Sequence, residues 1–106
     1  MQAQSGKQKK ADRLYKDFAY LEATEVYKDL IENDYNVTYN STRLGDAYMM
    51  LRSPENAVFY YGDVIEDTTI SPEYYYKYAQ ALRGVKRYDE SRTFLKRYLE
   101  TGRDSD

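Results

Sequence analysis

The sequence contains no cysteine, no histidine and no tryptophan among its 106 residues. Without cysteine the chain can form neither a disulfide nor a thiolate metal site. Without histidine it lacks the side chain that most often acts as general base, metal ligand or pH switch near neutrality. Paired carboxylates such as Asp12 and Asp46 remain, but nothing in the sequence places a nucleophile or an oxyanion hole near them. We therefore expect no enzymatic activity, no cofactor and no metal.

Long hydrophobic runs are also absent. No apolar stretch approaches the ~18 residues that a membrane-spanning helix needs, and no signal-peptide core is present. The net charge is −2, so the overall composition does not point to nucleic acid or to an acidic membrane surface. The length corresponds to one domain with a modest core. Fourteen tyrosines are too many to be fully buried together, so several should reach the surface or line a groove.

The most informative stretch is residues 44–48, Leu-Gly-Asp-Ala-Tyr, which Ala57 and Tyr61 follow. Its spacing resembles the tetratricopeptide repeat (TPR), a helix-turn-helix unit of 34 residues with the pattern W-x2-L-G-x2-Y…A-x3-F. Ser41 stands where that pattern has its tryptophan. A single match of this kind is moderate support for the repeat, so other positions at the same period have to agree.

Steps of 34 residues in both directions reach residues of the same size class. The corresponding sets are Ala11, Gly45 and Ala79; Leu14, Tyr48 and Leu82; Ala23, Ala57 and Ser91; and Tyr27, Tyr61 and Leu95. Small residues recur where two helices must touch, and large apolar residues recur where the helices of a pair are wedged together. We interpret the chain as three repeats over residues 4–37, 38–71 and 72–105. The resemblance implies an all-α fold, a right-handed α-solenoid of six antiparallel helices.

Apolar residues spaced three and four apart predict helices throughout, and no strand pattern occurs. The predicted helices cover residues 7–17, 20–33, 38–51, 53–67, 71–84 and 88–101. Ser53-Pro54 and Ser71-Pro72 read as helix starts, because serine caps free amides and proline suits the first helical position. The expected buried positions include Leu51, Tyr75, Tyr88 and Tyr98.

Polar and glycine-containing segments should bound these helices. Residues 1–6 are expected to be a disordered N-terminal tail, which leaves 7–102 as the TPR domain. Residues 33–36, Asn-Asp-Tyr-Asn, should break the helix because Asn and Asp favour turns. Gly102 is expected to end the last helix.

The first helix of each TPR lines a concave groove, and peptide ligands of the family usually lie there. The resemblance therefore implies a protein or peptide partner bound by the first helices. The expected groove residues are Asp12, Tyr15, Lys16, Tyr39, Arg43, Asp46, Met49, Tyr76, Lys77, Gln80 and Arg83. Tyr and Arg often dominate binding energy, and Met adapts to varied partners. The alternative is a solvated helix surface with incidental aromatic residues.

One subclass of the family binds the acidic C-terminal tail of heat-shock chaperones through Lys, Asn and Arg at fixed groove positions. Here those positions hold Gln8, Asp12, Arg43, Glu73 and Lys77. Two of them are acidic and would repel the acidic ligand, so chaperone-tail binding is not expected.

The last predicted helix carries apolar residues that no later helix covers. These residues are Phe94, Leu95, Tyr98 and Leu99. Solenoids usually end in a polar capping helix. We therefore expect either that the segment belongs to a longer chain or that it dimerises through this face. A structural spacer that stacks on a following domain is the corresponding alternative function.

Charge is unevenly distributed along the chain. Residues 17–73 carry twelve acids and three bases, whereas residues 77–103 carry eight bases and three acids. The basic end could be a patch for an acidic partner or, less in keeping with the overall charge, for nucleic acid; the ordinary interpretation is a solvated helix exterior. Two Asn-x-Thr sequons begin at Asn36 and Asn40, where turn and helix-start roles already explain the residues.

The start of the chain has a further resemblance. Residues 10–15, Lys-Ala-Asp-Arg-Leu-Tyr, with the later Tyr20-x2-Ala23-x3-Tyr27-x2-Leu30, are similar to the N-terminal repeat region of exported bacterial proteins of the OmpA family. Those proteins continue into a β-propeller and a peptidoglycan-binding domain, and some belong to envelope secretion or gliding machinery. The resemblance implies an adaptor in the periplasm at the outer membrane, with the cytoplasm as the alternative location. The function predicted from the whole sequence is a protein–protein interaction scaffold.

Overall fold

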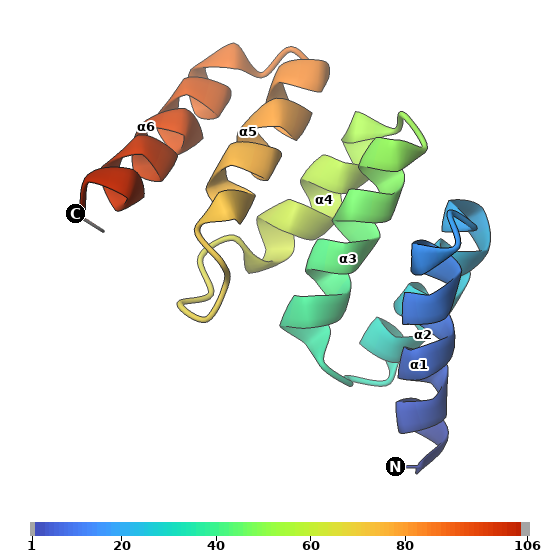
Figure 1. Cartoon of the computed structure of the whole chain (residues 1–106). Helices are drawn as coiled ribbons and strands as arrows, with labels where there is room; N and C mark the ends of the chain where they lie inside the picture. The colour runs from blue at the N-terminus through green and yellow to red at the C-terminus, as the bar shows by residue number, and fades with distance from the viewer. Residues whose placement is uncertain (1, 105–106) are drawn as a thin grey trace.

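The computed structural model describes residues 2–104, and the side chains of residues 3–102. The helices are α1 (Gln2–Lys16), α2 (Tyr20–Glu32), α3 (Val37–Met50), α4 (Pro54–Val64), α5 (Glu73–Gly84) and α6 (Tyr88–Asp104). They form three antiparallel pairs that follow one another across the molecule (Figure 1). No strand occurs in residues 2–104. The predicted all-α solenoid of three helix-turn-helix units is therefore confirmed.

The turn inside each pair has the same backbone geometry, repeated every 34 residues. Phe18, Arg52 and Lys86 have φ angles of 66°, 59° and 67°. The amide of the following residue donates to the carbonyl oxygen five residues earlier. These hydrogen bonds join Ala19 to Leu14, Ser53 to Tyr48 and Arg87 to Leu82, at 2.8 to 2.9 Å. A left-handed residue followed by this bond is the Schellman ending of a helix, which satisfies terminal carbonyl groups and reverses the chain.

Small residues let the two helices of a pair approach closely, as the repeat pattern predicts. A Cβ atom added to Gly45 would lie 2.4 Å from the ring of Tyr61, so a larger residue requires this ring to move. Ala11 and Ala79, at the matching positions, are 0% and 1% exposed. Ala57 of α4 is likewise fully buried.

The hydrophobic core is one continuous cluster along the solenoid. Its largest fully buried side chains include Tyr27, Leu30, Leu44, Tyr61 and Leu82. Burial of each such side chain contributes about 1.5–3 kcal/mol to stability. None of the helices between residues 2 and 104 combines the length and the apolar character that crossing a membrane requires.

Several helix ends differ from the prediction. Helix α1 begins at Gln2, so residues 2–6 of the expected disordered tail are helical, while Met1 lies outside the described residues. No proline interrupts these residues, and adding a turn to an existing helix is easier than starting one. Helix α6 continues through Gly102, which does not adopt the positive φ that a glycine stop requires. Helix α4 ends at Val64, before the predicted residue 67.

The two predicted serine caps are also different in the structure. Ser53 is the N-cap residue of α4, but its hydroxyl accepts a hydrogen bond from the Asn56 side chain at 2.8 Å instead of capping a backbone amide. Pro54 is the first residue of α4, as predicted. In α5 the N-cap residue is Pro72, one residue after Ser71.

Three residues that were predicted to be buried are exposed, and at a fourth position the neighbouring tyrosine is buried instead. Leu51, Tyr88 and Tyr98 are 37%, 51% and 38% exposed. Leu51 is the C-cap residue of α3, and Tyr88 is the first residue of α6. Tyr78 of α5 is buried, as predicted. Of the three consecutive tyrosines 74–76, however, the buried one is Tyr74, whose hydroxyl reaches a carboxylate of α3, whereas Tyr75 is only partly buried.

Candidate interaction surface

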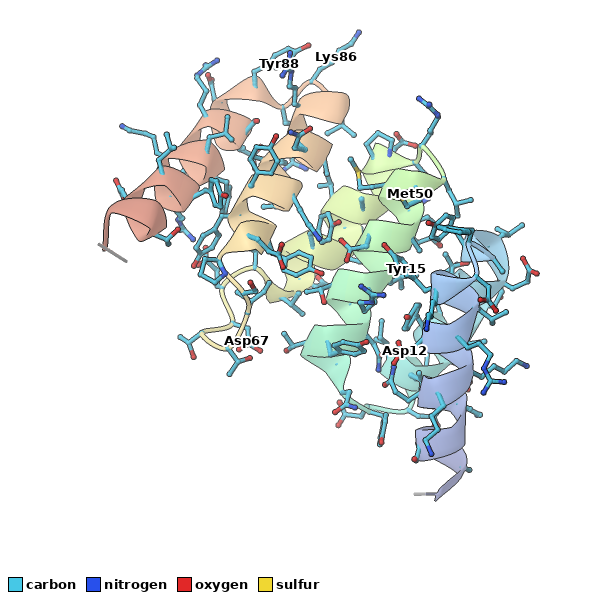
Figure 2. The ribbon with its side chains drawn as sticks, in the orientation of Figure 1. Asp12, Tyr15, Met50, Asp67, Lys86 and Tyr88 are labelled. Atoms are coloured by element: carbon cyan, nitrogen blue, oxygen red, sulfur yellow. The ribbon has the colours of Figure 1, made fainter. Side chains whose placement is uncertain are left out.

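Side chains of α1, α3 and α5 meet on one face of the solenoid, which we call the inner face (Figure 2). Tyr15 of α1, Met49 and Met50 of α3 and Tyr76 of α5 line one common pocket of about 270 Å³, the central pocket. The structure thus brings the first helices of all three repeats together, as the TPR resemblance implies.

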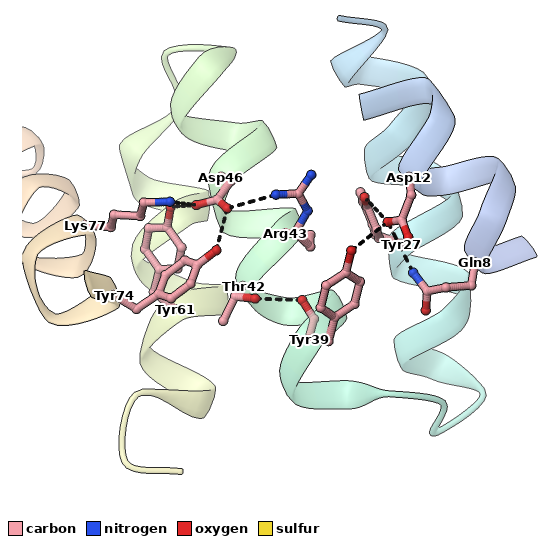
Figure 3. A network of polar contacts seen from close by, with 10 residues as sticks. All are labelled: Gln8, Asp12, Tyr27, Tyr39, Thr42, Arg43, Asp46, Tyr61, Tyr74 and Lys77. Atoms are coloured by element: carbon pink, nitrogen blue, oxygen red, sulfur yellow. Dashed lines mark hydrogen bonds and ion pairs between the residues drawn. The ribbon is translucent and has the colours of Figure 1, made fainter. Parts of the chain in front are cut away.

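Asp46 of α3 is the centre of the polar network on this face (Figure 3). Its carboxylate is 6% exposed and accepts hydrogen bonds from the hydroxyl groups of Tyr61 at 2.5 Å and Tyr74 at 2.6 Å. The ammonium of Lys77 lies at 3.6 Å and the guanidinium of Arg43 at 3.8 Å. A buried carboxylate destabilises a protein unless it is paired and hydrogen-bonded. Here the partners come from α3, α4 and α5, so one carboxylate ties the second repeat to the third.

Asp12 of α1 has the same role one repeat earlier. It accepts hydrogen bonds from Tyr27 at 2.7 Å, Tyr39 at 3.1 Å and Gln8 at 3.4 Å. Tyr27 belongs to the second helix of the same repeat, and Tyr39 to the first helix of the next. Asp12 therefore ties the first repeat to the second, as Asp46 ties the second to the third.

The third repeat lacks this tie. Thirty-four residues after Asp46, the matching position holds Gln80. Thirty-four residues after Tyr61, it holds Leu95. Leu95 has no hydroxyl to donate, and the Gln80 amide donates instead to the hydroxyl of Tyr76 at 2.5 Å. The carboxylate–phenol pair is thus made in the first two repeats and replaced in the third.

Arg43 packs on an aromatic ring of the preceding repeat, and Lys77 packs on a ring of its own helix, α5. The Arg43 guanidinium lies 3.9 Å from the centre of the Tyr15 ring, and the Lys77 ammonium lies 4.6 Å from that of Tyr74. Such contacts contribute about 0.5–2 kcal/mol, more when they are shielded from water. Arg43, through the Tyr15 ring, and Lys77, through its ion pair with Asp46, hold neighbouring first helices together as well as facing the inner surface.

Burial raises the pKa of Tyr27, Tyr61 and Tyr74 above the ordinary value of 10.0, and the neighbouring carboxylate of Asp12 or Asp46 raises it further. A phenolate beside a carboxylate would place two negative charges in a buried site. The phenols are therefore neutral hydrogen-bond donors at neutral pH, and the network depends on their protons.

Two further pockets lie on the inner face beside the central pocket. The linker pocket, about 320 Å³, is lined by residues of α3 and of the segment before α5, including Tyr39, Arg43, Ile70 and Tyr74. The small pocket, about 140 Å³, lies between α5 and α6 and is lined by Tyr76, Ala79, Gln80, Arg83, Ser91 and Leu95. Tyr76 and Gln80 line both the central and the small pocket, so these two are adjacent.

Most of the predicted groove residues line one of these three pockets. They are Tyr15, Tyr39, Arg43, Asp46, Met49, Tyr76, Lys77, Gln80 and Arg83. Asp12 lies beside Tyr39, to which it is hydrogen-bonded. Lys16 is exposed near the end of α1 and does not line them. Whether any of these residues binds a partner stays a prediction.

Sequence reasoning missed the groove role of Tyr61 and Tyr74, which line the central and linker pockets. A signal for Tyr61 was present, because an aspartate is followed fifteen residues later by a tyrosine in both Asp12–Tyr27 and Asp46–Tyr61. No comparable spacing marks Tyr74.

Four of the five side chains at the chaperone-tail positions, Gln8, Asp12, Arg43 and Lys77, make polar contacts within the protein. Gln8 donates to the Asn40 side chain at 2.8 Å, and Asn40 donates to the Tyr35 carbonyl oxygen at 2.9 Å. Asn40, the acceptor residue of one sequon, is 0% exposed and inaccessible to modification in the folded chain. Asn36, the other, is the exposed N-cap residue of α3 with a left-handed backbone.

The apolar residues of α6 are more covered than the sequence predicts. The ring centre of Phe94 lies 4.8 Å from that of Tyr78 in α5, and Leu95 lines the small pocket. Tyr98 and Leu99 remain 38% and 60% exposed. The expected exposed face of four residues is therefore reduced to two.

Several bases of the C-terminal half form ion pairs. Arg87 pairs with Glu90 at 2.7 Å, and Arg92 pairs with Asp89. Arg97 pairs with Glu66 of α4 at 2.8 Å. These pairs lower the positive charge that this end presents, in line with a solvated helix exterior.

No protein-family model matches the sequence, and no curated protein matches it. Among solved structures, the chain is similar to the one described as "Crystal structure of MamA", with 25% sequence identity and a TM-score of 0.77. The match covers 85% of this chain and 53% of the MamA chain, so this chain spans about half the length of that structure. MamA contains TPRs, and the likeness supports a TPR-like helical repeat here. None of the comparisons supports the resemblance to the OmpA family.

Proposed function

We propose that this chain is a protein–protein interaction module that holds a peptide segment of a partner protein on its inner face. TPR-like folds are typically interaction scaffolds without enzymatic activity. The observation that carries the proposal is the central pocket, where three repeats contribute side chains to one hollow. Met50 and Tyr76 of this pocket are 55% and 42% exposed, so both side chains are accessible to a partner.

The chemistry of the pocket indicates what it accepts. Tyr15, Met49, Met50 and Tyr76 form a wall of aromatic and thioether groups, which suits an apolar or aromatic side chain and adapts to its shape. Lys77 supplies a cation at the rim, with its side chain 38% exposed. We expect a peptide with a large apolar residue, bound next to a carboxylate or a backbone carbonyl group.

The network beneath the pocket prepares it for binding. Asp12 and Asp46 fix the spacing of α1, α3 and α5 through hydrogen bonds with tyrosines of neighbouring helices. A surface that is already ordered loses less conformational entropy when a ligand binds. Arg43 and Lys77 serve this framework, so the exposed Met50 and Tyr76 are better probes of binding than these two cations.

The test is a selection of displayed random peptides on the purified chain, followed by affinity measurements with variants. Met50→Glu places a charge in the central pocket, and its matched control is Phe59→Glu in α4, at a side chain that is 54% exposed and does not line this pocket. We expect Met50→Glu to weaken the selected peptides at least about tenfold, as for a residue at the centre of an interface. Phe59→Glu should leave their affinity unchanged. Peptides that bind both variants equally would contradict the proposal.

A second function, stacking through α6, is favoured by one observation. Val64 and Ile65 of α4 are 7% and 4% exposed, but the residues 34 positions later, Tyr98 and Leu99, are 38% and 60% exposed. In α4 these side chains are covered by the repeat that follows. Under this proposal α6 contacts another helix, either of a following domain or of a second copy of the chain.

Light scattering of the purified chain measures its molar mass and so distinguishes a second copy of the chain from a following domain as the partner of α6. A dimer that dissociates in Leu99→Glu supports self-association through α6, and a monomer leaves only the following domain. A dimer that Leu99→Glu does not affect would contradict the role of this face.

The location in the bacterial periplasm at the outer membrane also stays a proposal, motivated by the motifs of α1 and α2. Fractionation of the producing cells, with detection of the native protein, tests it. Recovery of the protein in the cytoplasmic fraction would overturn it.

A further inference from the structure

The small pocket lies where the first two repeats hold a tyrosine ring. Tyr27 and Tyr61 occupy matching positions in α2 and α4, and Leu95 occupies the next one in α6. Leucine has neither the flat ring nor the hydroxyl group of tyrosine. The third repeat therefore lacks the phenol group that the first two repeats hold at this position.

The two filled positions show how a ring fits at this site. The Tyr61 ring lies against Gly45, and its hydroxyl donates to Asp46 at 2.5 Å. In the first repeat Ala11 takes the place of the glycine, and the hydroxyl of Tyr27 still reaches Asp12 at 2.7 Å. A ring in this place is thus compatible with alanine as the small residue of the first helix.

The third repeat keeps the walls of the site and lacks the ring. Ala79, Gln80 and Leu95 line a pocket of about 140 Å³. The Gln80 side chain stands at the aspartate position, and its amide oxygen can accept a hydrogen bond from a phenol. Ser91, also in the wall, is 5% exposed and already donates to the Ala79 carbonyl oxygen at 2.8 Å. That part of the wall has no unsatisfied hydroxyl.

The size of the pocket suits an aromatic ring. An apolar protein cavity of ~150 Å³ stays dry and binds benzene. The small pocket is of similar volume, but Gln80, Arg83 and Ser91 make part of its wall polar and it is open to solvent. It shares Tyr76 with the central pocket. A peptide on the inner face could therefore place one side chain in the small pocket and a neighbouring one in the central pocket.

We propose that the small pocket between α5 and α6 is a binding site for an aromatic side chain of the partner peptide, which takes the place that Tyr27 and Tyr61 fill in the other repeats. The occupant is a phenylalanine or tyrosine ring, with a tyrosine hydroxyl directed to Gln80. This inference rests on the proposed function, because the ring belongs to a segment bound on the inner face.

The first test uses p-cresol, which reproduces the tyrosine side chain without a peptide. Titration of the isotope-labelled chain, followed by NMR, should give saturable shifts at the amides of Ala79, Gln80 and Leu95. Leu95→Tyr should abolish these shifts, because the new ring fills the pocket. Leu99→Tyr, on the same helix but outside the pocket lining, should preserve them. The absence of saturable shifts in the wild type, or equal shifts in Leu95→Tyr, would overturn the proposal.

If Leu95→Tyr does not fold, a second variant that enlarges the pocket can still test the proposal. If circular dichroism shows that Leu95→Tyr is unfolded, Leu95→Ala has to bind p-cresol at least as tightly as the wild type. Weaker binding by a folded Leu95→Ala would count against the site.

The selected peptides then separate this inference from the proposed function. We expect them to contain an aromatic residue and to bind Leu95→Tyr at least about tenfold more weakly than the wild type. Peptides that bind Leu95→Tyr normally but fail to bind Met50→Glu would contradict the aromatic site in the small pocket and still support peptide binding on the inner face. Peptides whose affinity changes with neither variant would contradict both proposals.

Discussion

The hydroxyl of Tyr61 donates a 2.5 Å hydrogen bond to the buried carboxylate of Asp46, while the ring of the same tyrosine lies against Gly45. One side chain of α4 thus closes the helix pair and also supports the inner face. Tyr27 makes the equivalent bond to Asp12 in the first repeat. Packing within a repeat and the shape of the candidate binding surface therefore depend on the same tyrosines.

Replacing Tyr61 by phenylalanine isolates the role of its hydroxyl. The ring and its packing remain, but Asp46 loses one of its two phenol donors and keeps its burial. Hydrogen bonds to charged groups contribute about 1.5–3 kcal/mol, so we expect the free energy of unfolding to fall by about 2 kcal/mol. Urea denaturation measures this change. Tyr88→Phe is the control at an exposed tyrosine, where the change should stay within about 0.5 kcal/mol.

Replacing Gly45 by alanine tests the close approach of α3 and α4. The new Cβ would lie 2.4 Å from the Tyr61 ring, which has to move and weaken its bond to Asp46. Overpacking costs about 1–3 kcal/mol, which exceeds the gain of up to about 1 kcal/mol from the helix propensity of alanine.

Gly6→Ala is the matched control for this substitution. Gly6 also lies within a helix, but no side chain stands within 4 Å of an added Cβ. We expect a lower melting temperature for Gly45→Ala and an equal or higher one for Gly6→Ala. A stabilised Gly45→Ala would show that the ring adjusts without loss.

The helix pairs were predictable because the repeat places similar residues at fixed intervals. Ala11, Gly45 and Ala79 mark the helix contacts by their small size and their 34-residue spacing, and the six helices follow from apolar spacing. The place of these side chains on the inner face was predictable for the same reason, since position in the repeat decides which side chains face inward, but their role in binding stays a prediction.

The differences occur where a single contact decides the outcome. Tyr74 is buried because its hydroxyl reaches Asp46, and three consecutive tyrosines give no signal that singles out the first. Gly102 was predicted to stop α6, but it does not adopt the left-handed conformation of a glycine C-cap, and the helix continues through it. The exposed Tyr88 lies at a helix start, where periodicity does not show which side a neighbouring helix covers.

The left-handed turn residues offer a route to higher stability. Lys86 has a φ of 67°, a conformation that costs about 1–2 kcal/mol for most residues and nothing for glycine. The greater freedom of glycine in the unfolded chain offsets about 0.5–1 kcal/mol of this gain. Lys86→Gly should therefore stabilise the fold by about 0.5–1 kcal/mol in thermal unfolding. Lys86→Ala removes the side chain without relieving the backbone, so an equal gain there would contradict the explanation.

The buried tyrosines make stability depend on alkaline pH. Tyr27, Tyr61 and Tyr74 have a pKa above 10.0 in the folded chain, because burial and a neighbouring carboxylate disfavour the phenolate. Below pH 10 both the folded and the unfolded chain hold these protons, so the groups contribute no pH dependence. Above pH 10 the unfolded chain releases protons first, and the free energy of unfolding should fall by up to about 1.4 kcal/mol per pH unit for each tyrosine. Urea denaturation at increasing pH, with the absorbance of ionised tyrosine recorded in parallel, measures this slope. Tyr61→Phe removes one of the three groups and should give a shallower slope, whereas an unchanged slope would show that Tyr61 ionises as freely in the fold as in the unfolded chain.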